Sequence, residues 1–172
     1  PTATPSPSPS PSPTLTPTPT PTLIVTNTND SGPGSLRQVI ADAQDGSVIG
    51  FDPALNGQTI SLNSGELYIN KSLTIDGPGP NLLTVSRDSK NLFFRIFHVF
   101  GLHTVTIRGL TITGGSGFPG GGIWNLRATL TLSNCVIREN VGTSGAGIHN
   151  GYAGQGAKLT IVDCSITGNE AN

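Results

Sequence analysis

Apolar and polar side chains alternate in short segments from residue 47 onward, and Gly, Asn, Asp or Pro separates each segment from the next. The segments are rich in Ile, Leu, Val and Thr, which favour extended strands. We expect strands in residues 47–51, 58–62, 67–75, 82–86, 104–113, 128–137 and 158–167. No helical pattern connects them, which argues against alternating strand–helix units.

The same apolar pattern recurs along the chain. LTLSNCVIREN at residues 130–140 returns as LTIVDCSITGN at residues 159–169, and GGGIWN at 120–125 returns as GAGIHN at 145–150. Alignment by apolar positions makes Ile75, Ile107, Leu132 and Ile161 equivalent, at intervals of 25 to 32 residues. The pairs Ile123 with Ile148 and Asn125 with Asn150 follow from the second block. A repeat at this interval indicates a stacked architecture.

Two columns of turn-forming residues accompany the apolar ones. The first contains Gly77, Gly109, Asn134 and Asp163, and the second contains Gly115, Asn140 and Asn169. Gly, Asn and Asp are the residue types that best tolerate a positive φ. We therefore expect a left-handed corner at each position.

One such unit cannot bury its own apolar face, but stacked units can, because each strand pairs with its equivalent in the next turn. The sequence therefore predicts an all-β fold, a parallel β-solenoid of about four to five turns from Ser47 onward. An antiparallel sandwich would explain short strands but not matched columns. Leucine-rich repeats have a shorter period and a different Leu/Asn pattern.

A single helix is expected ahead of the strands, at Ser35–Asp45. Ser35 and Gln38 can form a capping box, and Gly46 suits the helix end. Leu36, Val39, Ile40 and Ala43 lie on one apolar face, which could cover the open first turn of the solenoid. The segment LIVTNT at residues 23–28 is a candidate first strand beside this cap.

Residues 1–22 contain almost only Pro, Ser and Thr. We expect a disordered, extended linker without a core, serving as an interdomain spacer or as a glycosylated or wall-spanning stalk. Residues 23–172 are then one β-helix domain with its N-terminal cap. Because the chain starts at Pro1 and the last turn has no cap, we expect it to be part of a longer protein and C-terminally incomplete.

Charge and composition narrow the classes of partner and cofactor that the chain is expected to bind. A net charge of −1 gives no electrostatic reason to expect nucleic acid, and no run approaches the ~20 apolar residues of a membrane span. Two cysteines without a CxxC motif do not indicate a zinc or redox site. We expect a monomer with no cofactor.

The columns resemble the right-handed parallel β-helix proteins of the pectin-lyase-like superfamily, which bacteria secrete. GGGIWN and GAGIHN, with the I..N pieces, look like the repeats of polymorphic outer-membrane proteins. Residues 25–55, with SLRQVI, resemble an SLREA-like N-terminal module, although Gly34 stands where some members have a cysteine. The resemblance covers residues 23–172 and implies the fold and an extracellular location, but it says little about activity.

Polysaccharide lyases and hydrolases use clustered carboxylates, and in a solenoid these would recur in one column. The acidic residues do not recur in this way. Asp76 should lie over Arg108 as an outward ion pair, and Asp163 fits a corner. The aspartates around the cap, Asp30, Asp42, Asp45 and Asp52, are the remaining candidates for a Ca²⁺ site. We therefore assign no catalytic, cofactor-binding or metal residue.

Histidines and cysteines supply the last candidates. His98, His103 and His149 do not have metal-ligand spacing. His149 is equivalent to Trp124, and either side chain could point outward and contact a sugar. Cys135 and Cys164 are one turn apart in one column, at about 4.8 Å between Cα atoms. We favour a buried, reduced stack, with a disulfide as the alternative.

These observations predict a non-catalytic extracellular module for adhesion, surface structure or glycan binding, displayed on a stalk and attached to the cell surface or secreted. Its partners would be polysaccharides or the surface of a host or neighbouring cell. The alternatives are a piece of a polysaccharide lyase or glycoside hydrolase with catalytic turns downstream, and an autotransporter-like passenger.

Overall fold

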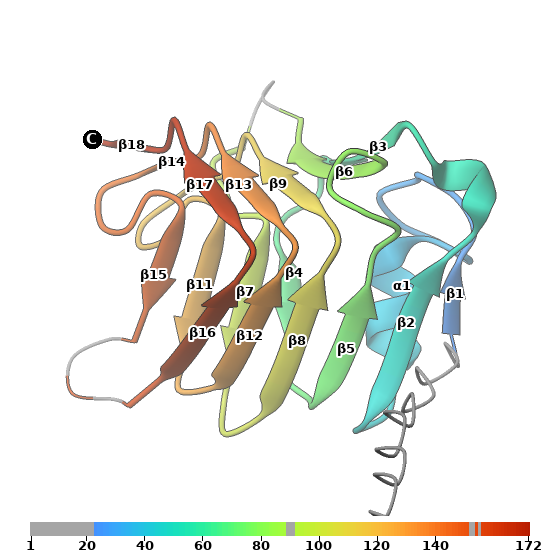
Figure 1. The fold of residues 1–172 in the computed structure, drawn as a ribbon, viewed down its shortest axis with the longest axis horizontal. Helices are drawn as coiled ribbons and strands as arrows, with labels where there is room; N and C mark the ends of the chain where they lie inside the picture. The colour runs from blue at the N-terminus through green and yellow to red at the C-terminus, as the bar shows by residue number, and fades with distance from the viewer. Residues whose placement is uncertain (1–22, 89–91, 152–153, 155) are drawn as a thin grey trace, which may run out of the picture.

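The chain winds into a parallel β-solenoid of about six turns (Figure 1). This computed structural model describes residues 23–88, 92–151, 154 and 156–172. Five turns follow from Ser47 onward, as predicted. The sixth comes from β1 (Leu23–Val25), which pairs in parallel with β2 (Ser47–Phe51). The predicted linker at residues 1–22 lies outside the described residues.

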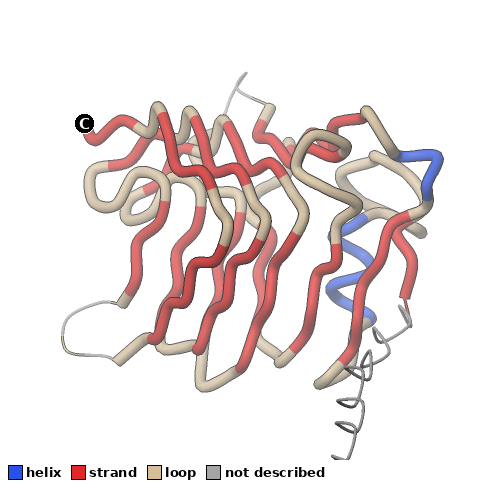
Figure 2. Tube along the Cα trace, in the orientation of Figure 1, coloured by secondary structure: helices blue, strands red, loops and turns tan. Residues whose placement is uncertain are grey.

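In the described part of the chain, four parallel sheets form the walls of the solenoid (Figure 2). Sheet A contains β1, β2, β5 (Leu73–Asp76), β8 (Thr104–Arg108), β12 (Thr129–Ser133) and β16 (Lys158–Val162). Sheet B contains β3 (Gln58–Leu62), β6 (Leu83–Arg87), β9 (Thr111–Thr113), β13 (Val136–Arg138) and β17 (Ser165–Thr167). Sheet C contains β4 (Leu67–Ile69), β7 (Phe97–Phe100), β11 (Ile123–Leu126) and β15 (Ile148–Asn150). Sheet D contains the two-residue strands β10 (Ser116–Gly117), β14 (Val141–Gly142) and β18 (Glu170–Ala171).

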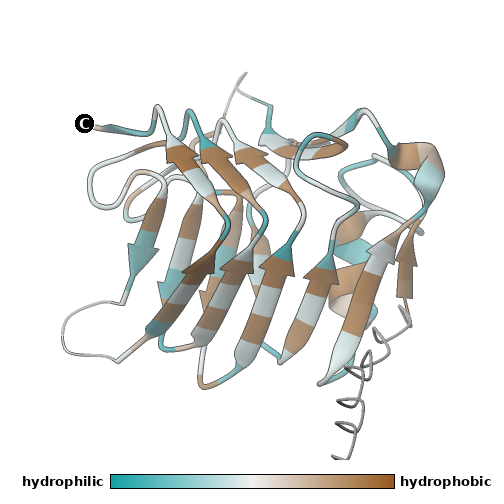
Figure 3. Ribbon diagram, viewed as in Figure 1, coloured by the Kyte–Doolittle hydropathy of each residue, from teal (hydrophilic) through white to brown (hydrophobic). Residues whose placement is uncertain are grey.

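The strand registers confirm the apolar columns. Ile75 pairs with Ile107, Ile107 with Leu132, and Leu132 with Ile161. Apolar and polar residues alternate along strands such as β8 and β12 (Figure 3), so one set points inward and the other outward. Ile75, Ile107 and Leu132 are fully buried, whereas Ile161, on the last strand of sheet A, is 42% exposed.

The predicted cap helix is present but shorter than expected. Helix α1 spans Leu36–Asp42, and the Ser35 side chain accepts a hydrogen bond from the Gln38 N–H, as an N-cap does. The reciprocal half of the capping box is absent, because the Gln38 side chain bonds Asp42 instead. The helix ends at Ala43 in extended conformation, so Gly46 is not its cap.

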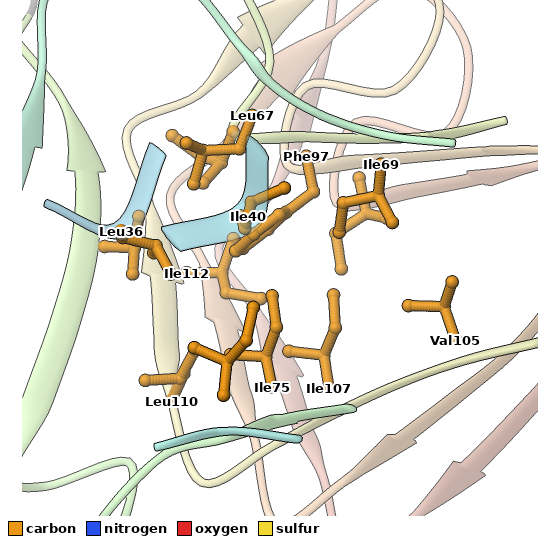
Figure 4. Packing of buried hydrophobic residues seen from close by; sticks show 14 of the residues in the cluster. Leu36, Ile40, Leu67, Ile69, Ile75, Phe97, Val105, Ile107, Leu110 and Ile112 are labelled. Carbon is orange, nitrogen blue, oxygen red and sulfur yellow. The ribbon is translucent and has the colours of Figure 1, made fainter. Parts of the chain in front are cut away.

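All four residues of the expected apolar helix face are buried: Leu36, Val39, Ile40 and Ala43. They belong to one cluster with the strand residues, including Leu67 and Ile75 (Figure 4). The helix therefore covers the first turns of the solenoid, as the pattern predicted.

The first corner column is left-handed at three of its four positions. Gly109, Asn134 and Asp163 have φ of 65°, 48° and 51°. Gly77 does not have a positive φ, so that part of the prediction was wrong. A Cβ at Gly77 would instead collide with the carbonyl oxygen of Gly109, which shows that close backbone approach requires glycine there.

The second corner column was predicted one residue too late. The left-handed residues are Gly114, Glu139 and Gly168, with φ of 68°, 54° and 60°. The following residues, Asn140 and Asn169, point their amides at the backbone of neighbouring turns. A pattern of residue types cannot separate these roles, because asparagine suits both.

Candidate functional site

The outer face of sheet C carries a column of ring-bearing side chains. Tyr68 pairs with His98, His98 with Trp124, and Trp124 with His149, one residue from each successive turn. Their neighbours along β4 and β7 are buried in the core, namely Leu67, Ile69, Phe97 and Val99. Strand alternation therefore places the column on the outside.

From Tyr68 to Trp124, the rings of the column contact one another. His98 stacks on Trp124 with ring centroids 4.5 Å apart and planes 15° apart. Tyr68 meets His98 edge-on at 5.1 Å and stacks on Phe100 at 6.1 Å. Tyr68 remains 44% exposed, so part of its ring faces the solvent while the rest packs against His98 and Phe100.

A charged network flanks the column. Glu66 precedes β4, and its two carboxylate oxygens contact Arg95 Nη1 and His98 Nδ1, each at 2.8 Å. Arg95 also donates to the carbonyl oxygens of Phe118 and Pro119, at 3.3 and 3.1 Å. Its guanidinium carbon lies 4.7 Å from the centroid of the Trp124 ring, within cation–π range. The network therefore links three turns to the tryptophan.

This network keeps Glu66 ionised. Burial opposes ionisation of the carboxyl group, but the hydrogen bond with His98 and the charge of Arg95 outweigh it and hold the pKa of Glu66 below its ordinary value. Burial lowers the pKa of Arg95, against the opposing effect of Glu66. Glu66 is thus a fixed negative charge rather than a proton donor near neutral pH.

A groove of about 460 Å³ opens beside the network. Its walls come from the loop before β7 and from β10 and β14, and Glu66 and Arg95 line it. Two phenylalanines on its walls are unusually open to solvent: Phe93 is 88% exposed and Phe118 is 75% exposed. Exposed aromatic side chains beside a groove commonly mark a binding surface.

The predicted equivalence of His149 and Trp124 is confirmed by their register. The His149 ring nitrogen Nδ1 lies 3.1 Å from the Ser144 hydroxyl. His103 does not join the column; its Nδ1 lies 4.0 Å from Asp45 at another part of the surface. Of the three histidines, the structure therefore brings His98 and His149 to the outer face of sheet C.

Other predicted pairs have structural roles. Asp76 and Arg108 form the predicted outward ion pair, with two contacts at 2.6 and 2.8 Å. The four aspartates around the cap bond different partners: Asp30 bonds Arg37, Asp42 bonds Gln38, Asp45 accepts from Ser72, and Asp52 caps a short 3₁₀ helix at Pro53–Leu55. Within the described ranges, no three His, Cys, Asp or Glu side chains gather as metal ligands.

Cys135 and Cys164 are free and not joined by a disulfide, as favoured from the sequence, but the prediction that both are buried holds only for Cys135. Cys135 is buried, and Cys164 is half-buried on the last turn. The Cys135 N–H points at the Cys164 sulfur, 3.4 Å away. Burial raises the pKa of the Cys135 thiol to about 11, so this thiol is unreactive near neutral pH.

Sequence reasoning missed Glu66, Tyr68 and Arg95. Strand β7 was not among the predicted strands, so His98 had no place in a column. The signal was present in FHVF at residues 97–100, where buried and outward positions alternate. Glu66 and Arg95 lie in loops, whose geometry no strand pattern specifies.

No helix in the described part of the chain is long and apolar enough to cross a membrane. Comparisons with models of protein families, with curated proteins and with solved structures found no match, so the chain is assigned to no family beyond its parallel β-solenoid architecture.

Proposed function

We propose that this chain is a non-catalytic, extracellular binding module that holds polysaccharide against the outer face of sheet C. The observation that carries the proposal is the column of outward rings, which begins at Tyr68, includes Trp124 and lies beside the groove of Phe93 and Phe118. A pyranose ring has an apolar face of C–H bonds and a rim of hydroxyls. Flat aromatic surfaces with adjacent polar groups suit both parts.

The architecture supports a binding role. Successive turns place one outward ring per strand, about 4.8 Å apart, so a linear ligand could contact several turns at once. Among the described groove residues, Glu66 is the only acidic side chain, and it is engaged by Arg95 and His98. Hydrolysis by inversion uses two carboxylates on opposite sides of the bond, so this groove favours binding over cleavage.

The resemblance to pectin-lyase-like β-helices and to polymorphic outer-membrane repeats is part of the same proposal. Secretion, attachment to the cell surface and adhesion would follow from it. The Pro/Ser/Thr-rich residues 1–22 would then hold the module away from the surface.

Trp124 is the single tryptophan of the chain, so its fluorescence reports directly on the column. We expect its emission to change on titration with at least one soluble polysaccharide from a panel of xylan, glucomannan, galactan, alginate and polygalacturonate. Tyr68→Ala should weaken that binding at least tenfold, because it removes the most exposed ring of the column.

Leu82→Ala is the matched control, since Leu82 is similarly exposed (41%) but precedes β6 of sheet B. It should bind as the wild type does. A panel without any binding, or Tyr68→Ala binding at wild-type strength, would refute the proposal. Release of reducing or unsaturated sugar would instead assign an enzyme.

A further inference from the structure

We propose that Arg37, on the cap helix, is a positioning residue that fixes the loop at residues 63–66 and thereby sets the Glu66 side chain in the sheet C site. The inference rests on the proposed function, because it concerns the same site. It gives the N-terminal cap a second role besides covering the core.

Arg37 holds the loop through several charge-assisted hydrogen bonds. Its Nη1 donates to the Glu66 carbonyl oxygen and its Nη2 to the Gly65 carbonyl oxygen, both at 2.7 Å. Nη2 also bonds the Asp30 carboxylate at 2.7 Å, and Nε bonds the Asp30 carbonyl oxygen at 3.1 Å. The planar guanidinium matches this spread of acceptors, which a lysine ammonium cannot span.

Asp30 also holds the loop, and together with Arg37 it forms a clamp on residues 64–66. Its second carboxylate oxygen accepts the backbone N–H of Ser64 at 3.0 Å. Burial opposes ionisation of Asp30, but the bonds from Arg37 and Ser64 outweigh it and lower the pKa of this carboxyl group. Three successive loop residues, Ser64, Gly65 and Glu66, are therefore held by two side chains of the cap region.

The loop depends on this clamp. Gly65 has a φ of 131°, a conformation that glycine adopts readily and residues with a Cβ rarely adopt. Ser64 is exposed, and Glu66 directly precedes β4. The clamp therefore acts where the loop enters the first strand of the column. A smaller cavity of about 150 Å³ is lined by Arg37, Glu66 and Tyr68, which places the clamp beside the aromatic column.

A movement of the loop would change the surroundings of the Trp124 ring through a chain of contacts. Glu66 bonds Arg95 and His98, and both of these contact the Trp124 ring. If the loop shifts, the carboxylate leaves its two partners, and Arg95 and His98 lose the charge that orients them. A carboxyl group without these partners returns toward its ordinary pKa, which is higher.

The test is made on the whole chain, first without sugar. The pKa of Glu66 is followed by carbon-detected NMR of its side-chain carboxyl group in wild type, Arg37→Met and Arg37→Lys. We expect Arg37→Met to raise this pKa toward the ordinary glutamate value, with Arg37→Lys in between. Gln38→Ala is the control on the same helix, because the Gln38 side chain bonds Asp42 at the surface and not the loop at residues 63–66; it should leave the pKa unchanged.

The second arm measures polysaccharide binding by Trp124 fluorescence in a double-mutant cycle. Arg37→Met should weaken binding roughly five- to tenfold in the wild-type background and add no further loss in Glu66→Gln. Equal losses in both backgrounds, or an unchanged Glu66 pKa, would overturn the inference. If Arg37→Met does not fold, Arg37→Lys carries both arms. Absence of any polysaccharide binding would remove the proposed function, while the pKa arm would still decide the role of Arg37.

Discussion

Asn140 illustrates how single polar residues organise the interior of this solenoid. It is fully buried, and its amide oxygen accepts the Gly115 N–H at 2.9 Å. Its amide nitrogen donates to the carbonyl oxygens of Ile112 and Arg138 and to the side chain of Asn169. One side chain thus satisfies the backbone of a corner where the strands of sheets B and D change direction.

Replacement of Asn140 should therefore be costly. We expect Asn140→Ala to lower the free energy of unfolding by about 2–4 kcal/mol, because a buried N–H and two carbonyl groups lose their partner. Urea denaturation followed by circular dichroism measures this change. Asn169→Ala, at the half-buried equivalent position, should cost less. Equal losses at the two positions would contradict the argument.

A second asparagine pair lies at the end of sheet C. The Asn125 amide nitrogen donates to the Asn150 side chain at 2.7 Å and to the Ala128 carbonyl oxygen at 3.2 Å. The sequence showed that these asparagines recur but not that they bond one another. Recurrence reveals equivalence between turns, whereas the direction of a side chain depends on the backbone angles of the corner.

At the level of elements, the backbones of neighbouring turns lie in close contact at the corner between sheets A and B. The Gly77 N–H donates to the Arg108 carbonyl oxygen at 2.9 Å, and the Gly79 N–H donates to the Gly109 carbonyl oxygen at 3.0 Å. The backbones of the two turns touch there, and no side chain fits between them. This contact explains the glycines at positions 77 and 109.

Gly77→Ala tests this contact. Its Cβ would collide with the Gly109 backbone and lie 2.6 Å from a Leu110 methyl carbon, so we expect a loss of about 2–4 kcal/mol in unfolding free energy. Gly156→Ala is the control, since no atom of the described residues outside its chain neighbours lies within 4 Å of its added Cβ. Chemical denaturation measures the free energy of unfolding of both variants. Similar values for the two would show that the corner can relax to accept a Cβ at position 77.

The strands of this molecule were more predictable than its site. Ile75, Ile107 and Leu132 could be aligned from the sequence because each turn places an apolar residue at the same buried position. The groove lies between the loop before β7 and the two-residue strands β10 and β14, and its exposed Phe93 and Phe118 do not recur in other turns. Arg37 was read as part of a cap motif, and only the folded chain reveals its contacts with residues 65 and 66.

Across the whole molecule, burial is uneven along the solenoid axis. Strand residues in the middle turns, such as Ile107 and Leu132, are fully buried, whereas Ile161 and Ile166 of the last turn are 42% and 45% exposed. At the opposite end, α1 covers the core (Figure 1). The two ends should therefore differ in local stability.

Amide hydrogen exchange measures this difference. We expect the slowest exchange in β8 and β12, which have partners on both sides, and the fastest strand exchange in β16 and β17. Helix α1 and β1 should fall nearer to the slow group, because they pack against each other at the capped end. Uniform protection along the axis would contradict this ordering.

The in-register pairing of equivalent strands has a consequence for length variation. Each strand of sheet C pairs only with the strands before and after it, so no contact in the sheet depends on the total number of strands. Duplication of one repeat, such as residues 120–144, would insert one more turn with a second tryptophan. The turns on either side would keep their strands unchanged. The count of repeats would then act as a ruler, and proteins built on this plan could match ligands of different chain length through gene duplication alone.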